Sequence, residues 1–367
     1  MKRFDIVIIG GGIAGASLGA ELAGKASVLL LEREQSPGYH ATGRSVAFWE
    51  ESYGGRVVQP LTTASGPMLR APDPDFSTRS FLSRRGTLHI GRMSDAGARD
   101  RLLDEFADRI ALTLVDPAAL LPGLSPEWTI GVLEPGVCDI DVAALHQAYL
   151  RSFRRKGGEA AFGAAFTSAQ AGEGGWIVES SVGKIRCGII VNAAGAWADE
   201  VASRCGVAPI GVTPLRRTVV QLRTPTMPGP QTPLVMDLGS RFYFKPEGEG
   251  RVWLTPHDEE PSPPCDAAPE EMAVAQAIAR FQEAVDWPIE AVERRWAGLR
   301  SFAPDRAPIY GFDPAAPSFF WFAGQGGFGI QTAPAAAMLA GSLLSGDDPP
   351  AAIEEIDSAP FSPARFR

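Results

Sequence analysis

Phe4-Asp5-Ile6-Val7-Ile8-Ile9-Gly10-Gly11-Gly12-Ile13-Ala14-Gly15 is the stretch that decides the fold of this chain. Its first half is almost entirely apolar, which predicts a buried strand, and its glycines predict a tight turn that opens a helix over residues 13–23. A second apolar segment, residues 27–31, predicts another strand and is followed by Glu32. Strand, turn, helix and strand form a β-α-β unit. The expected fold class is therefore α/β, with a Rossmann-like nucleotide-binding domain.

The pattern G-x-G-x-x-G gives each of its glycines a separate role. Gly10 permits the tight turn, Gly12 lets the backbone approach a pyrophosphate, and Gly15 allows the helix to pack closely on the strand. The N–H groups at Ile13 and Ala14 are expected to face the phosphates, because the positive end of the helix dipole lies there. In this strand–turn–helix context the motif predicts dinucleotide binding.

The acidic residue after the second strand narrows the choice of dinucleotide. Glu32 is placed to accept hydrogen bonds from ribose hydroxyls, and its negative charge would repel a 2′-phosphate, which argues against NADP. Arg33 follows it directly and is expected to contact the same cofactor. The motif by itself does not separate FAD from NAD.

Composition excludes several classes of function. The 367 residues carry a formal net charge of −9, whereas nucleic-acid-binding proteins usually present basic surfaces. None of the four cysteines belongs to a CxxC pair, so we expect reduced thiols, no metal site and a cytoplasmic location. No apolar run reaches the length of about 18 residues that a membrane helix needs, so no transmembrane segment is expected.

The remaining pattern predicts one discontinuous domain with an insertion. The expected helices cover residues 43–52, 96–108, 142–153, 270–284 and 330–344, and the expected strands cover residues 164–170, 175–180, 184–192, 218–222, 242–245 and 319–323. Glycine-rich turns that open helices stand near both ends of the chain. We therefore expect an FAD- or NAD-binding domain built from residues 1–72, 139–212 and 302–367, and a β-rich substrate domain built from residues 73–138 and 213–301.

Three further stretches separate FAD from NAD: Pro37–Ser45, Val191–Trp197 and Gly324–Thr332. Together with the first glycine motif, they resemble the signatures of the D-amino acid oxidase-like family of FAD-dependent oxidoreductases over nearly the whole chain. The resemblance implies FAD as the cofactor, and we expect it to be bound non-covalently. The residues that it assigns to FAD are Thr42, Gly43, Arg44, Ser45, Ala193, Ala194, Gly195, Trp197, Arg300, Gly326, Gly327, Phe328, Gly329, Ile330, Gln331 and Thr332.

Within that family, the chain is most similar to the bacterial D-arginine dehydrogenases. Stretches such as Gly38–Ser45 and Trp296–Phe302 carry this likeness. It implies that two arginines bind the substrate carboxylate bidentately, with Arg300 as the first candidate and Arg217 as the second. The pocket tyrosines that it implies are Tyr53 and Tyr243.

Two positions depart from that subgroup and change the expected substrate. Phe48 stands where the D-arginine dehydrogenases have a histidine, and Thr87 stands where they have a glutamate that would pair with a cationic side chain. Without that glutamate, a guanidinium or ammonium group would be left unpaired in a partly apolar site, which is costly. With Trp49 beside Phe48, the pocket is expected to take a neutral or hydrophobic D-amino acid.

The expected reaction is oxidation of the Cα–N bond, with hydride transfer to flavin N5 and hydrolysis of the resulting imine to an oxo acid. No histidine is an evident general base. His40 lies in a flavin-associated stretch, His89 lies near the expected pocket, and His146 flanks the apolar face of a helix, where a structural role is favoured. Water or a tyrosine would suffice as the base, and Glu50 could supply a carboxylate nearby.

Other functions remain open at this point. Glycine and sarcosine oxidases share this layout, as do flavin dehydrogenases that act on 2-hydroxy acids or glycerol phosphate. A non-catalytic FAD-binding subunit of a complex is an alternative of another class, although the retained arginines argue against it. The substrate is expected to carry a carboxylate, and the electron acceptor could be oxygen, a quinone or a protein.

Overall fold

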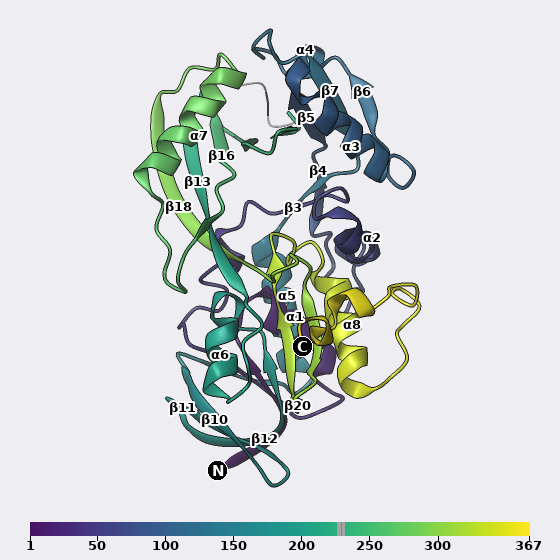
Figure 1. Ribbon diagram of the computed structural model, residues 1–367, viewed down its shortest axis with the longest axis vertical. Coiled ribbons are helices and arrows are strands. Elements are labelled where there is room, and N and C mark those ends of the chain that lie inside the picture. The colour runs from purple at the N-terminus through teal and green to yellow at the C-terminus, as the bar shows by residue number, and fades with distance from the viewer. Residues whose placement is uncertain (226–228, 230–231) are drawn as a thin grey trace.

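The computed structural model describes residues 1–225, 229 and 232–367, which form two bodies stacked along the longest axis of the molecule (Figure 1). Both termini lie in the lower body. Its eight-stranded sheet has the order β10-β11-β12-β1-β2-β9, with β20 pairing β12 and β19 pairing β20. These strands are β1 (Lys2–Ile9), β2 (Val28–Glu32), β9 (Glu159–Phe162), β10 (Phe166–Gly172), β11 (Gly175–Ser180), β12 (Gly183–Asn192), β19 (Ile309–Asp313) and β20 (Ala316–Ala323).

The central strand β1 is buried on both faces. It lies parallel to both β12 and β2, as a nucleotide-binding unit requires. Its alternate residues enter two different cores, with Ile6 and Ile8 on one face and Val7 and Ile9 on the other. This explains why the strand is a continuous apolar run rather than an alternating one.

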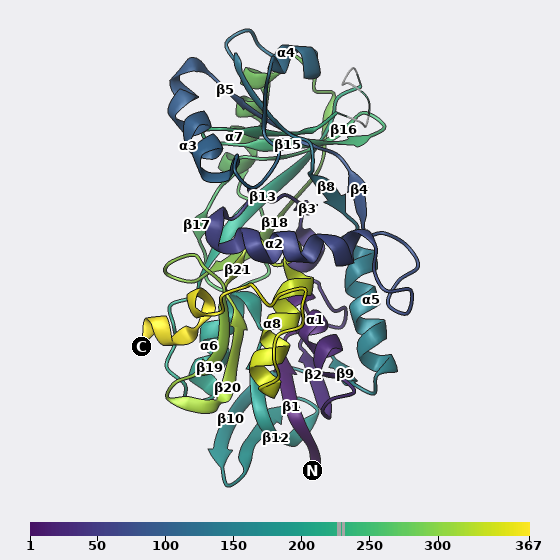
Figure 2. The ribbon, with the colours of Figure 1, turned by 90° about the vertical axis from the view of Figure 1, so that its right-hand side faces the viewer.

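Helices cover one face of this sheet. α1 (Ile13–Leu22) contacts both α5 (Val142–Arg155) and α8 (Ala333–Ser345), so segments from the two ends of the chain and its middle form one layer (Figure 2). The hairpin of β10 and β11 and the short helix α6 (Ala198–Arg204) lie on the side of the second core. The fold is thus mixed α/β, as predicted.

The upper body is built on a ten-stranded sheet of order β21-β18-β13-β16-β15-β14-β5-β7-β6, with β17 pairing β13. Its strands are β5 (Thr87–Gly91), β6 (Thr113–Val115), β7 (Ile130–Glu134), β13 (Thr213–Arg223), β14 (Leu234–Asp237), β15 (Tyr243–Gly248), β16 (Arg251–Thr255), β17 (Glu260–Pro261), β18 (Ala291–Phe302) and β21 (Gln325–Gly326). The helices α3 (Ala96–Phe106), α4 (Pro117–Leu120) and α7 (Glu271–Ala284) accompany it. Phe281 of α7 is fully buried in the core of this body.

Several contacts hold the bodies together. The long strand β18 ends beside β21, where Ser301 pairs with Gly326. A small sheet of β3 (Phe48–Trp49), β4 (Leu82–Arg84) and β8 (Cys138–Ile140) lies near α2 (Gly55–Arg70), which crosses the boundary between the bodies in Figure 2. Residues from all parts of the chain therefore meet at this boundary.

The predicted helix over residues 43–52 is wrong. A 3-10 turn at Thr42–Arg44 is followed by the extended strand β3, and Ala47 between them has a φ of 27°. The helix of this region is α2, which the sequence analysis missed because it contains Pro60 and Pro67. The last helix begins at Ala333, later than the predicted Ile330.

Among the described residues, none of the helices has the length and the apolar character needed to cross a lipid bilayer.

Candidate active site

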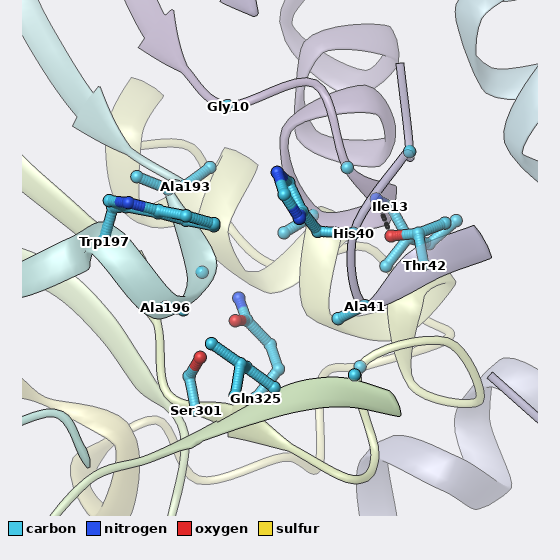
Figure 3. A pocket seen from close by; sticks show the side chains of 18 of the residues that line it. Gly10, Ile13, His40, Ala41, Thr42, Ala193, Ala196, Trp197, Ser301 and Gln325 are labelled. Carbon is cyan, nitrogen blue, oxygen red and sulfur yellow. Dashed lines mark hydrogen bonds between the residues drawn. The ribbon is translucent and has the colours of Figure 1, made fainter. Parts of the chain in front are cut away.

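A cavity of about 340 Å³ is lined by residues of both bodies. Figure 3 shows Trp197 and His40 on one side of it and Ser301 and Gln325 on the other. Most residues that the sequence assigns to the cofactor lie in its wall: Gly10, Gly12, Ile13, Ala14, Glu32, Arg33, Thr42, Arg44, Ser45, Ala193, Ala194, Gly195, Trp197, Arg300, Gly326, Gly327, Gly329 and Ile330.

The first glycine turn touches the end of β12 so closely that a side chain has no room. Gly10 has a φ of 110°, and a Cβ atom there would lie 2.4 Å from the carbonyl oxygen of Ala193. A Cβ atom on Gly15 would lie 1.9 Å from the carbonyl oxygen of Gly10. The structure thus brings the turn at residues 10–15 and the stretch at residues 193–197 together at one wall of the cavity.

Glu32 is held in the cavity wall by two backbone amides. Gly11 N donates to Oε2 at 2.6 Å, and Glu34 N donates to Oε1 at 2.8 Å. Beside it, the guanidinium of Arg33 lies 4.6 Å from the ring centroid of Trp197. The carboxylate is therefore fixed where a ribose hydroxyl would meet it.

The start of α1 differs in one detail from the expectation. Ile13 N donates to Thr42 Oγ1 at 3.0 Å, shown as a dashed line in Figure 3, so this amide is already used to bind the neighbouring loop. His146 Nε2 lies 2.9 Å from the carbonyl oxygen of Gly11, and desolvation lowers the pKa of His146. This buried contact supports the structural role that the sequence analysis favours for His146.

The loop before β3 connects the two bodies next to the cavity. Arg44 Nη1 donates to the carbonyl oxygens of Ala267 and Ala297, at 2.9 Å and 3.0 Å, and its Nη2 pairs with Asp266. His40 Nε2 lies 3.0 Å from Glu34 Oε1, and its ring lies 4.7 Å from that of Trp197. This loop is therefore a fixed part of the cavity wall.

Two arginines from neighbouring strands lie at the far end of the cavity. Arg300 on β18 donates from Nη1 to Tyr53 Oη at 2.7 Å. Arg217 on β13 donates from Nε to the carbonyl oxygen of Asp258 at 2.8 Å and from Nη2 to Glu259 Oε1 at 3.2 Å. Its Nη1 is buried and meets no hydrogen-bond partner among the described residues. Desolvation, and then the charge of Arg300, lowers the pKa of Arg217, so the pair favours an anion beside it.

Aromatic rings close this end. The Phe48 ring lies 5.5 Å from Tyr53 and 5.7 Å from Tyr243, both edge to face. Burial raises the pKa of Tyr243, so its phenol stays protonated at neutral pH. These rings belong to a side pocket of about 20 Å³. The residues that line it are Ser45, Ala47, Phe48, Tyr53, Tyr243, Arg300, Gly327, Ile330 and Gln331.

His257 is a neighbour of this site that the sequence analysis did not assign. Its ring lies 5.8 Å from that of Tyr243, and its Nδ1 lies 2.8 Å from the carbonyl oxygen of Ser240. Desolvation, followed by the charges of Arg217 and Arg300, lowers the pKa of His257 to about 3. The imidazole is therefore neutral at neutral pH. No local motif marks it, because the fold brings it here from the loop after β16.

Two residues predicted for the substrate pocket lie elsewhere. Trp49 is buried in the core of the lower body, where its Nε1 donates to the carbonyl oxygen of Thr62 at 2.8 Å. Thr87 is fully buried on β5 beside Glu50. Among the described residues that line the cavity or the side pocket, neither is present. The strand at Phe48–Trp49 explains the position of Trp49, because successive residues of a strand point to opposite faces.

Five residues assigned to the cofactor do not line the large cavity, although Gln331 lines the side pocket. Phe328 packs in a small core with Phe302, and Thr332 Oγ1 donates to the carbonyl oxygen of Phe328 at 2.9 Å. A Cβ atom on Gly43 would lie 2.7 Å from the carbonyl oxygen of Gly38. The five residues are Gly15, Gly43, Phe328, Gln331 and Thr332.

A comparison with protein families identifies the family of this chain. The profile of the family DAO, described as "FAD dependent oxidoreductase", matches residues 5–343. This chain belongs to the DAO family. Its members are FAD-dependent oxidoreductases, and the residues present fit that cofactor, because the walls combine a glycine turn without room for a Cβ atom with a fixed carboxylate at Glu32.

Individual relatives of the DAO family are distant. Glycine oxidase of Pseudomonas aeruginosa is 24% identical, with 98% of each chain covered. Dimethylglycine dehydrogenase of Rattus norvegicus is 26% identical over 68% of this chain. The chain spans between 30% and 40% of the length of the first curated relatives that it matches, among them FAD-dependent oxidoreductase domain-containing protein 1 of Xenopus laevis at 28% identity.

Solved structures agree on the fold. Glycine oxidase from Geobacillus kaustophilus superposes with a TM-score of 0.85 at 20% identity, covering 100% of both chains. L-proline dehydrogenase from P. horikoshii also gives a TM-score of 0.85 at 20% identity, covering 100% of this chain and 98% of that one. At this identity, the likeness shows the fold of the DAO family alone.

Proposed function

We propose that this chain oxidises the Cα–N bond of a small neutral or hydrophobic D-amino acid. The single observation that carries the proposal is the unpartnered Nη1 of Arg217, which is buried beside the second guanidinium, that of Arg300, at the aromatic end of the cavity. A buried donor without a partner is costly, and a substrate carboxylate would satisfy it. The arrangement supports a site for a carboxylate, since Arg217 pairs with Gly298 and Arg300 with Leu215, which puts the two arginines diagonally across the paired strands on the same face.

The aromatic rings favour an uncharged substrate side chain. Phe48, Tyr53 and Tyr243 form the walls next to the arginine pair, and a cationic side chain placed among them would be desolvated without a partner. The side pocket of about 20 Å³ favours a short side chain. The D configuration rests on the resemblance to the D-arginine dehydrogenases.

The chain's own residues would bind and orient the substrate. Arg217 and Arg300 would hold the carboxylate, and the protonated phenol of Tyr243 would donate a hydrogen bond rather than act as a base. FAD, when bound, would accept the hydride from Cα. The substrate amine must be neutral at that point, and we propose that water takes its proton, because the titratable neighbour His257 lies on the carboxylate side, next to both arginines.

Anaerobic stopped-flow reduction of the purified holoprotein tests this proposal. D-alanine and D-serine are expected to reduce the flavin at least about tenfold faster than D-arginine, because burying an unpaired cation costs more than about 1.4 kcal/mol. Rapid reduction by D-arginine, or by the L-amino acids alone, would contradict it. Repeating the best reaction in air, and again anaerobically with an added quinone, shows whether oxygen or a quinone reoxidises the flavin.

A glycine- or sarcosine-type oxidase is the second candidate. The glycine oxidase of Pseudomonas aeruginosa matches along 98% of each chain, and the small side pocket suits a substrate without a side chain. In the same stopped-flow series, glycine or sarcosine would then reduce the flavin faster than any D-amino acid with a side chain. The 2-hydroxy acids D-lactate and glycolate complete the series as the third class.

A further inference from the structure

A buried cluster of three side chains that can bind a metal lies next to the end of β3. Its residues line neither the large cavity nor the side pocket. Glu50 is fully buried, His89 is 4% exposed and Glu134 is 3% exposed. Glu50 follows β3, His89 lies on β5, and Glu134 ends β7. Thr87 pairs directly with Glu134, so Thr87, His89 and Glu134 lie on the same face of the upper sheet. The segment at Glu50 approaches this face from the boundary between the bodies.

The distances suit a shared cation better than direct hydrogen bonds. His89 Nε2 lies 3.5 Å from Glu50 Oε1 and 3.6 Å from Glu134 Oε2, and one ligand atom from each residue lies within 4.8 Å of the others. Hydrogen bonds between such groups are about 2.7–3.2 Å long. With metal–ligand bonds of about 2.1 Å, two ligand atoms of a tetrahedral site lie about 3.4 Å apart.

The unpartnered atoms point to a missing ligand. Both carboxylate oxygens of Glu50 and Nε2 of His89 are buried and make no hydrogen bond of ordinary geometry in the described part of the chain, although the Thr87 hydroxyl lies beside Glu50. Glu134, in contrast, is oriented by donors from the segment after Glu50, since Ser52 Oγ donates at 2.6 Å and Glu51 N at 3.2 Å. A carboxylate fixed in this way by its neighbours resembles a ligand held by an outer shell of hydrogen bonds.

Charge gives the same indication. Two carboxyl groups lie in this buried cluster, and among the residues that the structure describes, His89 is the basic side chain that both of them approach within 4 Å. Buried charges are normally paired or coordinated to a metal. A divalent cation with two carboxylates and one neutral imidazole makes the cluster electrically neutral.

We propose that Glu50, His89 and Glu134 bind a divalent first-row transition cation, with Zn²⁺ as the first choice. One imidazole nitrogen and two carboxylate oxygens are ligands that Zn²⁺ accepts, and a fourth position is left for water or for the buried hydroxyl of Thr87. The site would be structural. It would fasten the segment that carries Tyr53 to the upper sheet, next to Arg300. The sequence analysis expected no metal because the three ligands come from distant segments without any motif.

Metal analysis of the holoprotein tests this inference without any substrate, so it is independent of the proposed function. Protein dialysed against metal-free buffer is analysed by inductively coupled plasma mass spectrometry, as wild type and as Glu50→Gln, His89→Asn and Glu51→Gln. We expect about one zinc ion per chain in the wild type, loss in the first two variants, and retention in Glu51→Gln, whose side chain bonds Thr63 instead.

Stability gives the second measurement. After removal of metal with dipicolinate, added Zn²⁺ is expected to raise the Tm of the wild type and of Glu51→Gln, and to leave that of Glu50→Gln unchanged. Less than about a tenth of an equivalent of any transition metal in the wild type, together with no Zn²⁺-dependent change in Tm, would overturn the proposal. Should the variants fail to fold, these two wild-type measurements decide alone.

Discussion

At the scale of single residues, the unpartnered guanidinium nitrogen of Arg217 carries the functional account. Arg217→Lys is expected to lower kcat/KM about 100-fold, or ~3 kcal/mol, because the ammonium group of a lysine cannot keep the bonds to the loop at Asp258 and also reach the substrate carboxylate. Steady-state kinetics with the best D-amino acid measures this. Arg216→Lys is the matched control, since Arg216 is the next residue on β13 and pairs with Glu270 instead. Equal kcat/KM values for the two variants would refute the proposal that Arg217 binds the substrate carboxylate.

His257 gives a prediction about pH. Its folded pKa of about 3 lies below its unfolded value near 6.5, so the unfolded chain binds more protons between these two pH values. The free energy of unfolding therefore falls as pH drops from about 6.5 towards 3. In His257→Asn, which suits the positive φ at this position, the loss of Tm between pH 7 and pH 5 is expected to be smaller than in the wild type. An unchanged loss in the variant would show that His257 does not titrate in this way.

At the scale of elements, the account depends on the contact between the turn after β1 and the end of β12. Gly10→Ala is expected to give protein with little or no bound FAD and a lower Tm, because the new Cβ atom would lie 2.4 Å from the carbonyl oxygen of Ala193 in a backbone conformation with positive φ. The flavin-to-protein absorbance ratio measures this. Gly136→Ala is the control, since a Cβ atom there meets no described atom within 4 Å. Full flavin content in Gly10→Ala would show that the close contact between Gly10 and Ala193 is not needed for FAD binding.

The sequence predicted the elements whose patterns are local. The β-α-β unit could be predicted, because β1 is apolar on both faces and Gly10 and Gly15 mark the turn. The helix predicted over residues 43–52 failed because β3 is defined by pairing with β8, a partner far away in sequence. The prolines of α2 hid a real helix. The pairing of β3 with β8 also explains why Trp49 was wrongly assigned to the pocket, because the direction of its side chain depends on the strand and not on the residue type.

At the scale of the whole molecule, the cavity forms at the boundary of the two bodies, and residues of both bodies line it. β21 follows β20 of the lower sheet along the chain and pairs with β18 of the upper sheet, and Arg44 of the lower body binds carbonyl groups of the upper one. The division into a discontinuous FAD domain and an inserted substrate domain stays a prediction, and β21, at residues 325–326 of the expected FAD domain, pairs with β18 of the upper sheet. The sequence could predict the arginines and tyrosines of the site through the family resemblance, whereas His257 and the Glu50 cluster emerge only when distant segments meet.

The central claim is that a substrate carboxylate lies between Arg217 and Arg300 while the bound flavin oxidises its Cα. Anaerobic reduction of the wild-type flavin by D-alanine and by D-alaninamide, which differ only in the carboxylate, tests this claim most directly. We predict that D-alanine bleaches the flavin and that the amide does so at least about 100-fold more slowly, a difference of ~2.7 kcal/mol. Equal rates for the two compounds, or a flavin that D-alanine leaves oxidised, would contradict the account.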